Sequence, residues 1–369
     1  MTSPHIQYLV SSPYGDIPLD KNKLDFPLET DTLKTSYREY FDSIKNFLAR
    51  EDFKTLLNAT SKKLGRKLLL REINKITIRT EKHGLLYHPA SIELILQREK
   101  AKFCLNVAVS DSGKAWLQEE ISTLQKLYNA LHLPYLPEVY FGGTHNSMLF
   151  LLEDWFEGYH EFHITRDEGG EKKLQLWEFG EGYTCISTEQ AFEIYKQASK
   201  ILTLYYDLKD FREIYPWHHA AGDFIAKKDG KATDVRLSTA RRYEPLLDYT
   251  KETNPFLALF YFFLNLSIRM RLDRIDGVGE IVWADDFCVE ATVTGFIEAL
   301  KIKEDLDSYP SLAEEFLSLA RSFRKDELTD SFKLIKELYQ GSEDLPVITN
   351  NLKEHVEALC VTLETLPLI

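Results

Sequence analysis

Cysteine is scarce in this sequence, and the few cysteines lie far apart. The chain has four, and no two of them have C-x-x-C spacing: Cys104, Cys185, Cys288 and Cys360. A disulfide framework or a zinc site needs cysteines at short, regular spacings. We therefore expect reduced core residues in a cytoplasmic protein, and neither cross-links nor a zinc centre.

Long apolar runs and an excess of positive charge are also lacking. The longest apolar stretch, residues 255–268, is interrupted by Asn265, so it is too short to span a bilayer and predicts a buried helix. No basic segment followed by an apolar one opens the chain, which argues against a signal peptide. The net charge of −13 disfavours nucleic acid and anionic membranes as partners, because either favours a basic face. We expect a soluble protein with a small-molecule or nucleotide ligand, and a protein partner is possible.

The residues that are present suffice for a large core. The chain has 369 residues, of which 44% are hydrophobic and 12% aromatic, and this length exceeds one compact domain. We expect an α+β protein of two lobes. The predicted divisions are an N-terminal arm and bracing helix (1–64), a β-rich lobe (65–154) and a mainly helical lobe (155–369).

Hydrophobic periodicity places the elements within these divisions. Residues 1–30 lack periodicity and predict an irregular arm, whereas residues 31–60 carry an apolar helical stripe. Strands are predicted at residues 68–70, 73–78, 92–96, 103–109 and 148–155. An inserted hairpin or loop is predicted at 158–173. Helices are predicted at residues 114–131, 188–208, 256–270, 287–300, 311–323, 329–338 and 352–366.

The segment from Trp217 to Leu237 carries the most chemistry. Two histidines and Asp223 lie in a short loop, and Asp229-Gly230 separates two short apolar runs. Asp-Gly between such runs predicts a tight hairpin, because the turn needs residues that tolerate positive φ. We expect the hairpin to bring Asp223 near Asp234. Two carboxylates beside a histidine-bearing loop suit a divalent cation and the phosphates that it carries.

This order of loop, hairpin and second aspartate resembles the catalytic and metal-binding segment of the protein-kinase-like superfamily. The likeness is greatest to its small-molecule branch of aminoglycoside, choline and homoserine phosphotransferases. The resemblance covers roughly residues 65–300. It implies a two-lobed kinase-like fold, ATP and Mg²⁺ as cofactors, and Asp223 and Asp234 as metal ligands. In the place of the catalytic aspartate stands His218, a candidate general base because the imidazole pKa is near working pH.

The same resemblance implies nucleotide-binding residues in the β-rich lobe. Asn106 occupies the place of the strand lysine, and Glu120 best matches the helix glutamate that pairs with this lysine. Lys102 lies on the same strand face as Asn106 and is a possible substitute, or else a solvated edge charge. The stretch from Glu153 to Phe156, which includes Trp155, would border the base. The loop at 81–89 has a single glycine, which is weak evidence for a phosphate cradle.

Arginines follow the hairpin. Arg236, Arg241 and Arg242 can hold a phosphate or an acidic substrate in a bidentate fork, or pair with neighbouring carboxylates. Both interpretations stay open at this point.

Histidine suggests a rival site. Six of the ten histidines fall in the pairs 83/88, 160/163 and 218/219, and imidazole is a common ligand for transition metals. No pair has an established metal-binding spacing. Three functional classes therefore remain: a pseudokinase that binds a ligand or a partner, an atypical phosphotransferase or adenylyl transferase, and a histidine-based metal protein.

Overall fold

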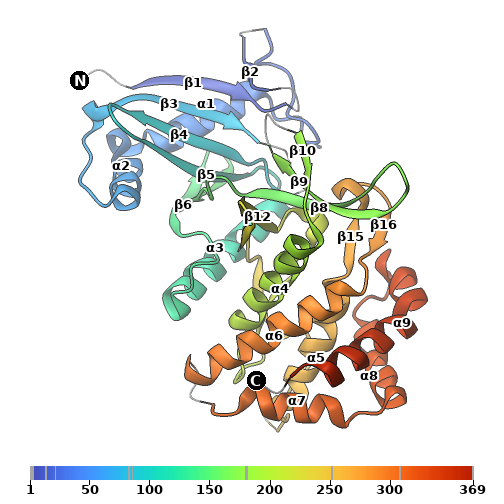
Figure 1. Cartoon of the computed structure of the whole chain (residues 1–369). Helices are drawn as coiled ribbons and strands as arrows, with labels where there is room; N and C mark the ends of the chain where they lie inside the picture. Colours follow the sequence, from blue (N-terminus) through green and yellow to red (C-terminus); the bar gives the residue numbers. More distant parts are fainter. Residues whose placement is uncertain are drawn as a thin grey trace. The chain divides into compact units, whose positions relative to one another are not determined.

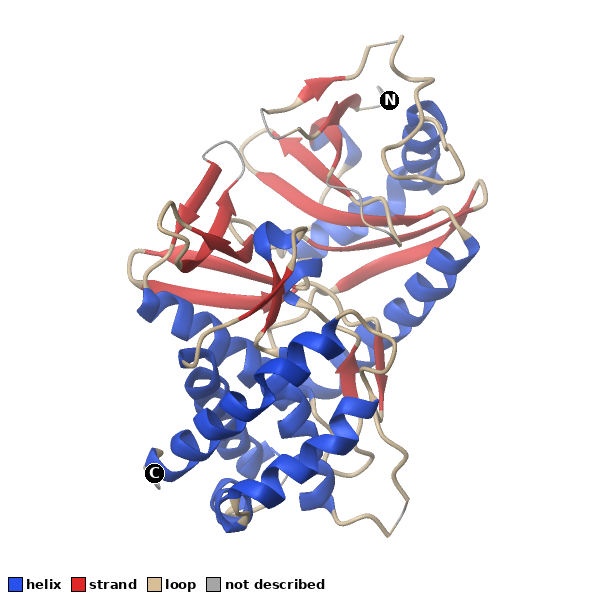
Figure 2. Cartoon of the chain, turned by 90° about the vertical axis from the view of Figure 1, so that its right-hand side faces the viewer, coloured by secondary structure: helices blue, strands red, loops and turns tan. Residues whose placement is uncertain are grey.

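The structure, a computed structural model, describes residues 4–12, 15–20, 22–81, 84, 86–178, 182–250, 252–306 and 309–367. The chain divides into two compact units, Met1–Glu157 and Gly158–Ile369, here called unit 1 and unit 2. The boundary lies three residues after the predicted division at 154. The fold is α+β: sheet strands dominate the N-terminal part and helices the C-terminal part (Figure 1, Figure 2).

Unit 1 is built on a seven-stranded sheet of order β2-β1-β3-β4-β5-β7-β6. β1 runs parallel to β3, and the other neighbours are antiparallel. The strands are β1 (His5–Val10), β2 (Ile17–Pro18), β3 (Ile73–Thr80), β4 (Ala90–Leu96), β5 (Lys100–Ala108), β6 (Val139–His145) and β7 (Met148–Asp154). The prediction of an irregular N-terminal arm is therefore wrong for β1 and β2. The predicted strand at 68–70 is also wrong, because a 3-10 turn (η1, Leu70–Glu72) starts there.

The two faces of this sheet differ in chemistry. α1 (Tyr37–Leu48) and α2 (Arg50–Leu64) share one apolar core with Phe103, Leu105 and Val107 of β5, which confirms the predicted helical stripe. Because side chains alternate along a strand, Lys102, Cys104 and Asn106 point to the opposite face. α3 (Asp111–Leu131) packs against β5, β6 and β7 and begins at the cap residue Ser110.

Unit 2 contains a five-stranded antiparallel sheet of order β10-β9-β8-β12-β13. Its strands are β8 (His160–Arg166), β9 (Lys172–Glu178), β10 (Gly182–Cys185), β12 (Phe224–Asp229) and β13 (Ala232–Leu237). β8 and β9 form the hairpin predicted at 158–173, and β12 and β13 form the hairpin predicted around Asp229-Gly230. Two short pairs complete the strands: β11 (Glu213–Tyr215) with β14 (Arg242–Glu244), and β15 (Leu272–Arg274) with β16 (Ile281–Trp283).

Helices make up the rest of unit 2. They are α4 (Thr188–Tyr205), α5 (Pro255–Arg269), α6 (Phe287–Leu306), α7 (Leu312–Ser322), α8 (Lys325–Glu337) and α9 (Asp344–Thr365), all near predicted positions. α4 and α6 lie so close that a Cβ on Gly295 would fall 1.9 Å from the carbonyl oxygen of Lys196. Only glycine fits at this crossing. α4 also packs on β13, which holds the hairpin in place.

The helices and the cysteines bear on two expectations drawn from composition. In the part of the chain that the structure describes, no helix has the length and apolarity needed to cross a bilayer. All four cysteines are free, as expected. The expectation that they are core residues holds for Cys288, which is buried, and is wrong for Cys185, which is exposed.

Candidate functional site

In unit 2 the predicted residues surround the loop that joins β11 to β12. This loop holds a single 3-10 turn (η2, His219–Ala221), which ends at Gly222 with φ +68°. A Cβ at Gly222 would lie 2.7 Å from the carboxyl carbon of Glu161, so the glycine lets this carboxyl pack against the loop. The peptide bond between Tyr215 and Pro216 is cis.

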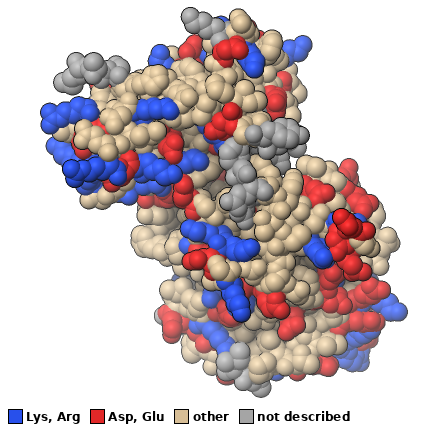
Figure 3. All heavy atoms as spheres, turned by 45° about the horizontal axis from the view of Figure 1, so that its top comes forward, with Lys and Arg blue, Asp and Glu red and all other residues tan. Residues whose placement is uncertain are grey.

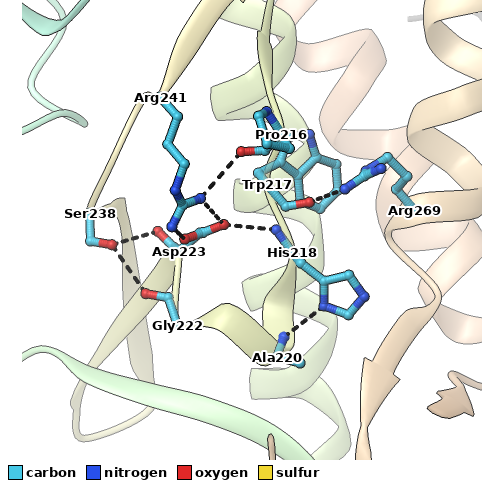
Figure 4. A network of polar contacts seen from close by, with 9 residues as sticks. All are labelled: Pro216, Trp217, His218, Ala220, Gly222, Asp223, Ser238, Arg241 and Arg269. Carbon is cyan, nitrogen blue, oxygen red and sulfur yellow. Dashed lines mark hydrogen bonds and ion pairs between the residues drawn. The ribbon is translucent and has the colours of Figure 1, made fainter. Parts of the chain in front are cut away.

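Asp223 is a buried ion-pair partner of Arg241. Its carboxylate is 1% exposed and accepts two hydrogen bonds from the guanidinium, at 2.8 and 2.7 Å (Figure 4). It also accepts the backbone N–H of His218 at 2.9 Å. Such a bidentate pair fixes both oxygens. Asp223 therefore stabilises the loop. Two roles were open for Arg241, binding a phosphate or acidic substrate and pairing with a neighbouring carboxylate, and the structure shows the pairing.

Asp234, the second predicted metal ligand, is also paired with an arginine. It lies on β13 and accepts hydrogen bonds from Arg236 and from the hydroxyl of Tyr159. Arg236 was predicted to bind cofactor. Its guanidinium pairs with Asp234 and lies 5.3 Å from the centre of the Tyr159 ring. The network joins two side chains of β13 to Tyr159, which precedes β8.

The hairpin register separates the two aspartates. Asp234 lies opposite Lys227, whereas Asp223 precedes Phe224, which pairs with Leu237. Asp223 is therefore four residues along the chain from the position opposite Asp234, about 13 Å along the strand. The expectation that the hairpin brings them together is therefore wrong. As arranged, these two carboxylates do not form a divalent-cation site.

His218 has its hydrogen-bond roles fixed by the loop. Its Nδ1 accepts the backbone N–H of Ala220 at 3.0 Å (Figure 4). The neutral ring then carries its hydrogen on Nε2 and presents a donor there. Burial, followed by the charge of Arg269, lowers the pKa of His218. A general base needs a free ring nitrogen, and the unprotonated one is already in use.

A cluster that local sequence patterns do not indicate is centred on Asp273 of β15. Asp273 is 1% exposed and accepts the backbone N–H of Ile164 at 2.9 Å. The imidazole of His163 lies between two carboxylates, with Nδ1 3.6 Å from Asp273 and Nε2 3.5 Å from Glu161. Burial alone would lower the His163 pKa, but the two carboxylates raise it to about 9. His163 is therefore an imidazolium ion at neutral pH.

His219 is surrounded by aromatic rings, whereas His163 lies between carboxylates. It is 1% exposed, and four aromatic rings lie 5.5–5.7 Å from its own: Phe162, Tyr195, Trp217 and Phe224. Burial lowers its pKa to about 3. It stays neutral, and the stability that follows from this is lost as pH falls from 6.5 towards 3. His219 is a core residue.

The histidine pairs do not assemble a metal centre in the described ranges. Within them no group of three or more His, Cys, Asp or Glu side chains is arranged to hold a metal ion. His83 lies outside the described residues. His88 is 5% exposed, and its pKa is lowered by burial.

In unit 1 the predicted nucleotide-binding residues form two groups on one sheet face. Asn106 donates its amide N–H to Glu153 at 2.8 Å, and Glu153 lies opposite Cys104 across β5 and β7. Glu120 of α3 is 1% exposed and close enough to act on Glu153. Burial, followed by the charge of Glu120, raises the Glu153 pKa well above its usual value. Both effects favour the neutral form of Glu153.

Lys102 and Trp155 form the second group. The Lys102 ammonium lies 3.8 Å from the centre of the Trp155 ring, a cation–π contact. Burial lowers the pKa of this lysine. An aromatic face and an ammonium side by side suit a flat, negatively charged ligand, because one can stack and the other can neutralise.

Comparison with known proteins adds no identification. No protein-family model matches the chain, and no curated protein matches it significantly.

Proposed function

We propose that the chain is a kinase-like ligand-binding protein without metal-dependent phosphotransfer, whose ligand is a nucleotide or a related small molecule. The kinase-like part of the proposal is supported by the order of elements in unit 1. An antiparallel run of strands reaches β5 with Lys102, α3 with Glu120 follows, and β7, which ends at Asp154, carries Glu153. This is the order that the resemblance implies.

One observation carries the proposed lack of phosphotransfer. Both carboxylates expected to hold Mg²⁺ accept hydrogen bonds from arginines, Asp223 from Arg241 and Asp234 from Arg236. A cation would have to displace both guanidinium groups and then bridge carboxylates held far apart on the hairpin. The fixed tautomer of His218 also argues against the base that an atypical phosphotransferase would need.

Calorimetric titration with ATP, in Mg²⁺ and in EDTA, tests the proposal. We expect ATP to bind with affinities that agree within about twofold, because the carboxylates are already neutralised. Lys102→Met should weaken binding at least tenfold, about 1.4 kcal/mol. Lys100→Met is the matched control, because Lys100 lies on the same strand but pairs at the surface with Glu93 and Glu157.

Turnover assays separate the alternatives. Mg²⁺-dependent release of ADP that is lost in Asp234→Asn would support the phosphotransferase instead. Release of pyrophosphate would support adenylyl transfer. Absence of binding by any nucleotide would remove the nucleotide ligand from the proposal.

A further inference from the structure

Arg269 lies beside the loop and differs from the neighbouring arginines in its partners, which are neutral groups and not a carboxylate. It is the last residue of α5, and its guanidinium lies between aromatic faces, 4.9 Å from the Tyr215 ring centre and 5.1 Å from that of Trp217. It donates a hydrogen bond to the backbone carbonyl of Trp217 (Figure 4). That acceptor is neutral.

No carboxylate lies close enough to form an ion pair with Arg269 in the described part of the chain, with 4.0 Å as the limit. The Nε of this arginine is buried without a hydrogen-bond acceptor. The buried Glu213 feels its charge, but burial raises the Glu213 pKa to about 8, so this carboxyl is mostly neutral at pH 7. Asp344 acts on Arg269 only at longer range. A buried charge is normally paired or hydrogen-bonded. Arg269 is hydrogen-bonded to neutral groups, the Trp217 carbonyl and Tyr339, and has no carboxylate at ion-pair distance in the described part of the chain.

The other arginines near the loop show what compensation looks like. Arg241 has Asp223, Arg271 has Asp286 and Arg274 has Glu343, each within 2.9 Å. The contrast is sharper because unit 2 is rich in acidic residues. An arginine that remains without one of them is a feature of this position, not of the composition.

A second donor lies on the same side of the loop as Arg269. The His218 ring presents Nε2–H, and the charge of Arg269 acts on this ring, which places the two groups near one another. In Figure 4 both lie on the right of the loop, whereas Arg241 and Asp223 lie on the left. The side chains of Arg269 and His218 are both partly exposed.

We propose that Arg269 and His218 form a binding site for a small oxyanion, such as the phosphate or carboxylate group of a metabolite. The guanidinium supplies a planar fork of N–H donors, and His218 supplies a third donor. Tyr215 and Trp217 hold the guanidinium between their rings, so little conformational freedom is lost on binding. The site is independent of nucleotide binding at Lys102, and either can fail without the other.

The test is a titration with inorganic phosphate, monitored by calorimetry and thermal unfolding, against chloride at equal ionic strength. We expect saturable binding of phosphate and a higher melting temperature, because a ligand of the native state stabilises it. Arg269→Gln should weaken binding at least tenfold, and Arg269→Lys, which keeps the charge but loses the fork, severalfold. His218→Ala should weaken it less than Arg269→Gln.

Arg321→Gln is the matched control. Arg321 is another partly buried arginine that donates to backbone carbonyls, those of Leu363 and Leu366 at the end of α9. Arg321 is not part of the network around the Trp217 loop, so this variant should lose stability but keep wild-type phosphate affinity. Acetate and AMP in place of phosphate distinguish a carboxylate from a nucleotide as the source of the oxyanion.

A test without substitutions covers the case in which Arg269→Gln does not fold. Phosphate should protect Arg269 from modification by phenylglyoxal at least severalfold, as mapped by mass spectrometry, and should leave Arg321 unprotected. Two results overturn the proposal: phosphate that acts no differently from chloride, or binding and protection that do not involve Arg269.

Discussion

The two units handle charge in different ways. Unit 1 has 20 Lys and Arg and 20 Asp and Glu, so the whole net charge of −13 belongs to unit 2. Figure 3 shows this on one face, where Lys and Arg gather on unit 1 and Asp and Glu on unit 2. The buried polar groups of the two units nevertheless show the opposite trend to their net charges. Unit 1 buries carboxyl groups beside an amide, whereas acidic unit 2 surrounds its loop with guanidinium groups.

Asp223 and Glu153 make the comparison concrete. Each is at most 2% exposed, and each was predicted as a site residue. Asp223 accepts two hydrogen bonds from Arg241, whereas Glu153 accepts one from the neutral amide of Asn106 and lies near the acidic Glu120. Burial alone does not decide the state of a carboxyl group. Its partner decides whether it is an ion or a neutral acid.

The largest expected effect on stability comes from breaking the ion pair between Asp223 and Arg241. Asp223→Asn removes the carboxylate of its buried ion pair with Arg241, which costs on the order of 3 kcal/mol. Urea unfolding measures this loss. Asp234→Asn is the control, because Asp234 is 47% exposed and its pairing is worth less than about 1 kcal/mol. Equal losses in the two variants would contradict the account of Asp223.

The next effect is the pH dependence contributed by His163 in unit 2. Its pKa is raised from 6.5 to about 9, so its contribution is complete below pH 6.5 and is lost as pH rises through 9. The loss amounts to about 3 kcal/mol. His163→Gln should flatten stability over this interval. Hydrogen exchange in β8 and β15 at pH 6 and pH 9 measures it, and an unchanged slope in the variant would rule the contribution out.

The smallest effect is expected in unit 1. Glu153→Gln keeps an acceptor for Asn106 and removes a carboxyl whose raised pKa already lowers stability at pH 7, so the variant should be at least as stable as the wild type at pH 7. A raised carboxyl pKa gives stability that is lost as pH rises through the folded-state value, so the variant should gain relative stability at pH 9. Thermal unfolding measures both. Glu119→Gln, at an exposed neighbouring position, is the control. A large loss of stability at pH 7 in Glu153→Gln would contradict the raised pKa of Glu153.

Local sequence signals predicted much of the fold. The Asp229-Gly230 turn, the Ser187 capping box of α4 and the helical stripe at 37–48 each act within a few residues, and each is present as predicted. β1 was missed because it is stabilised by parallel pairing with β3, nearly 70 residues later. α9 starts eight residues before the predicted start, because its first turns lack the apolar periodicity of the rest.

The candidate site was harder to predict than the fold. The loop, the hairpin and the acidic residues were predicted. Whether Asp223 and Asp234 meet depends on the register of β12 against β13, which residue spacing alone does not determine. Arg269 and Asp273 have no local signal, because tertiary packing brings them to the loop from the end of α5 and from β15. Asn106 and Glu153 were each named, but their hydrogen bond required the pairing of β5 with β7.

The central claim is that arginines already neutralise the two carboxylates expected to bind a metal. Titration of Mn²⁺, a paramagnetic substitute for Mg²⁺, monitored by electron paramagnetic resonance, tests it most directly. The account predicts no Mn²⁺ bound to the protein alone at millimolar concentration. Stoichiometric binding that is lost in both Asp223→Asn and Asp234→Asn would contradict it.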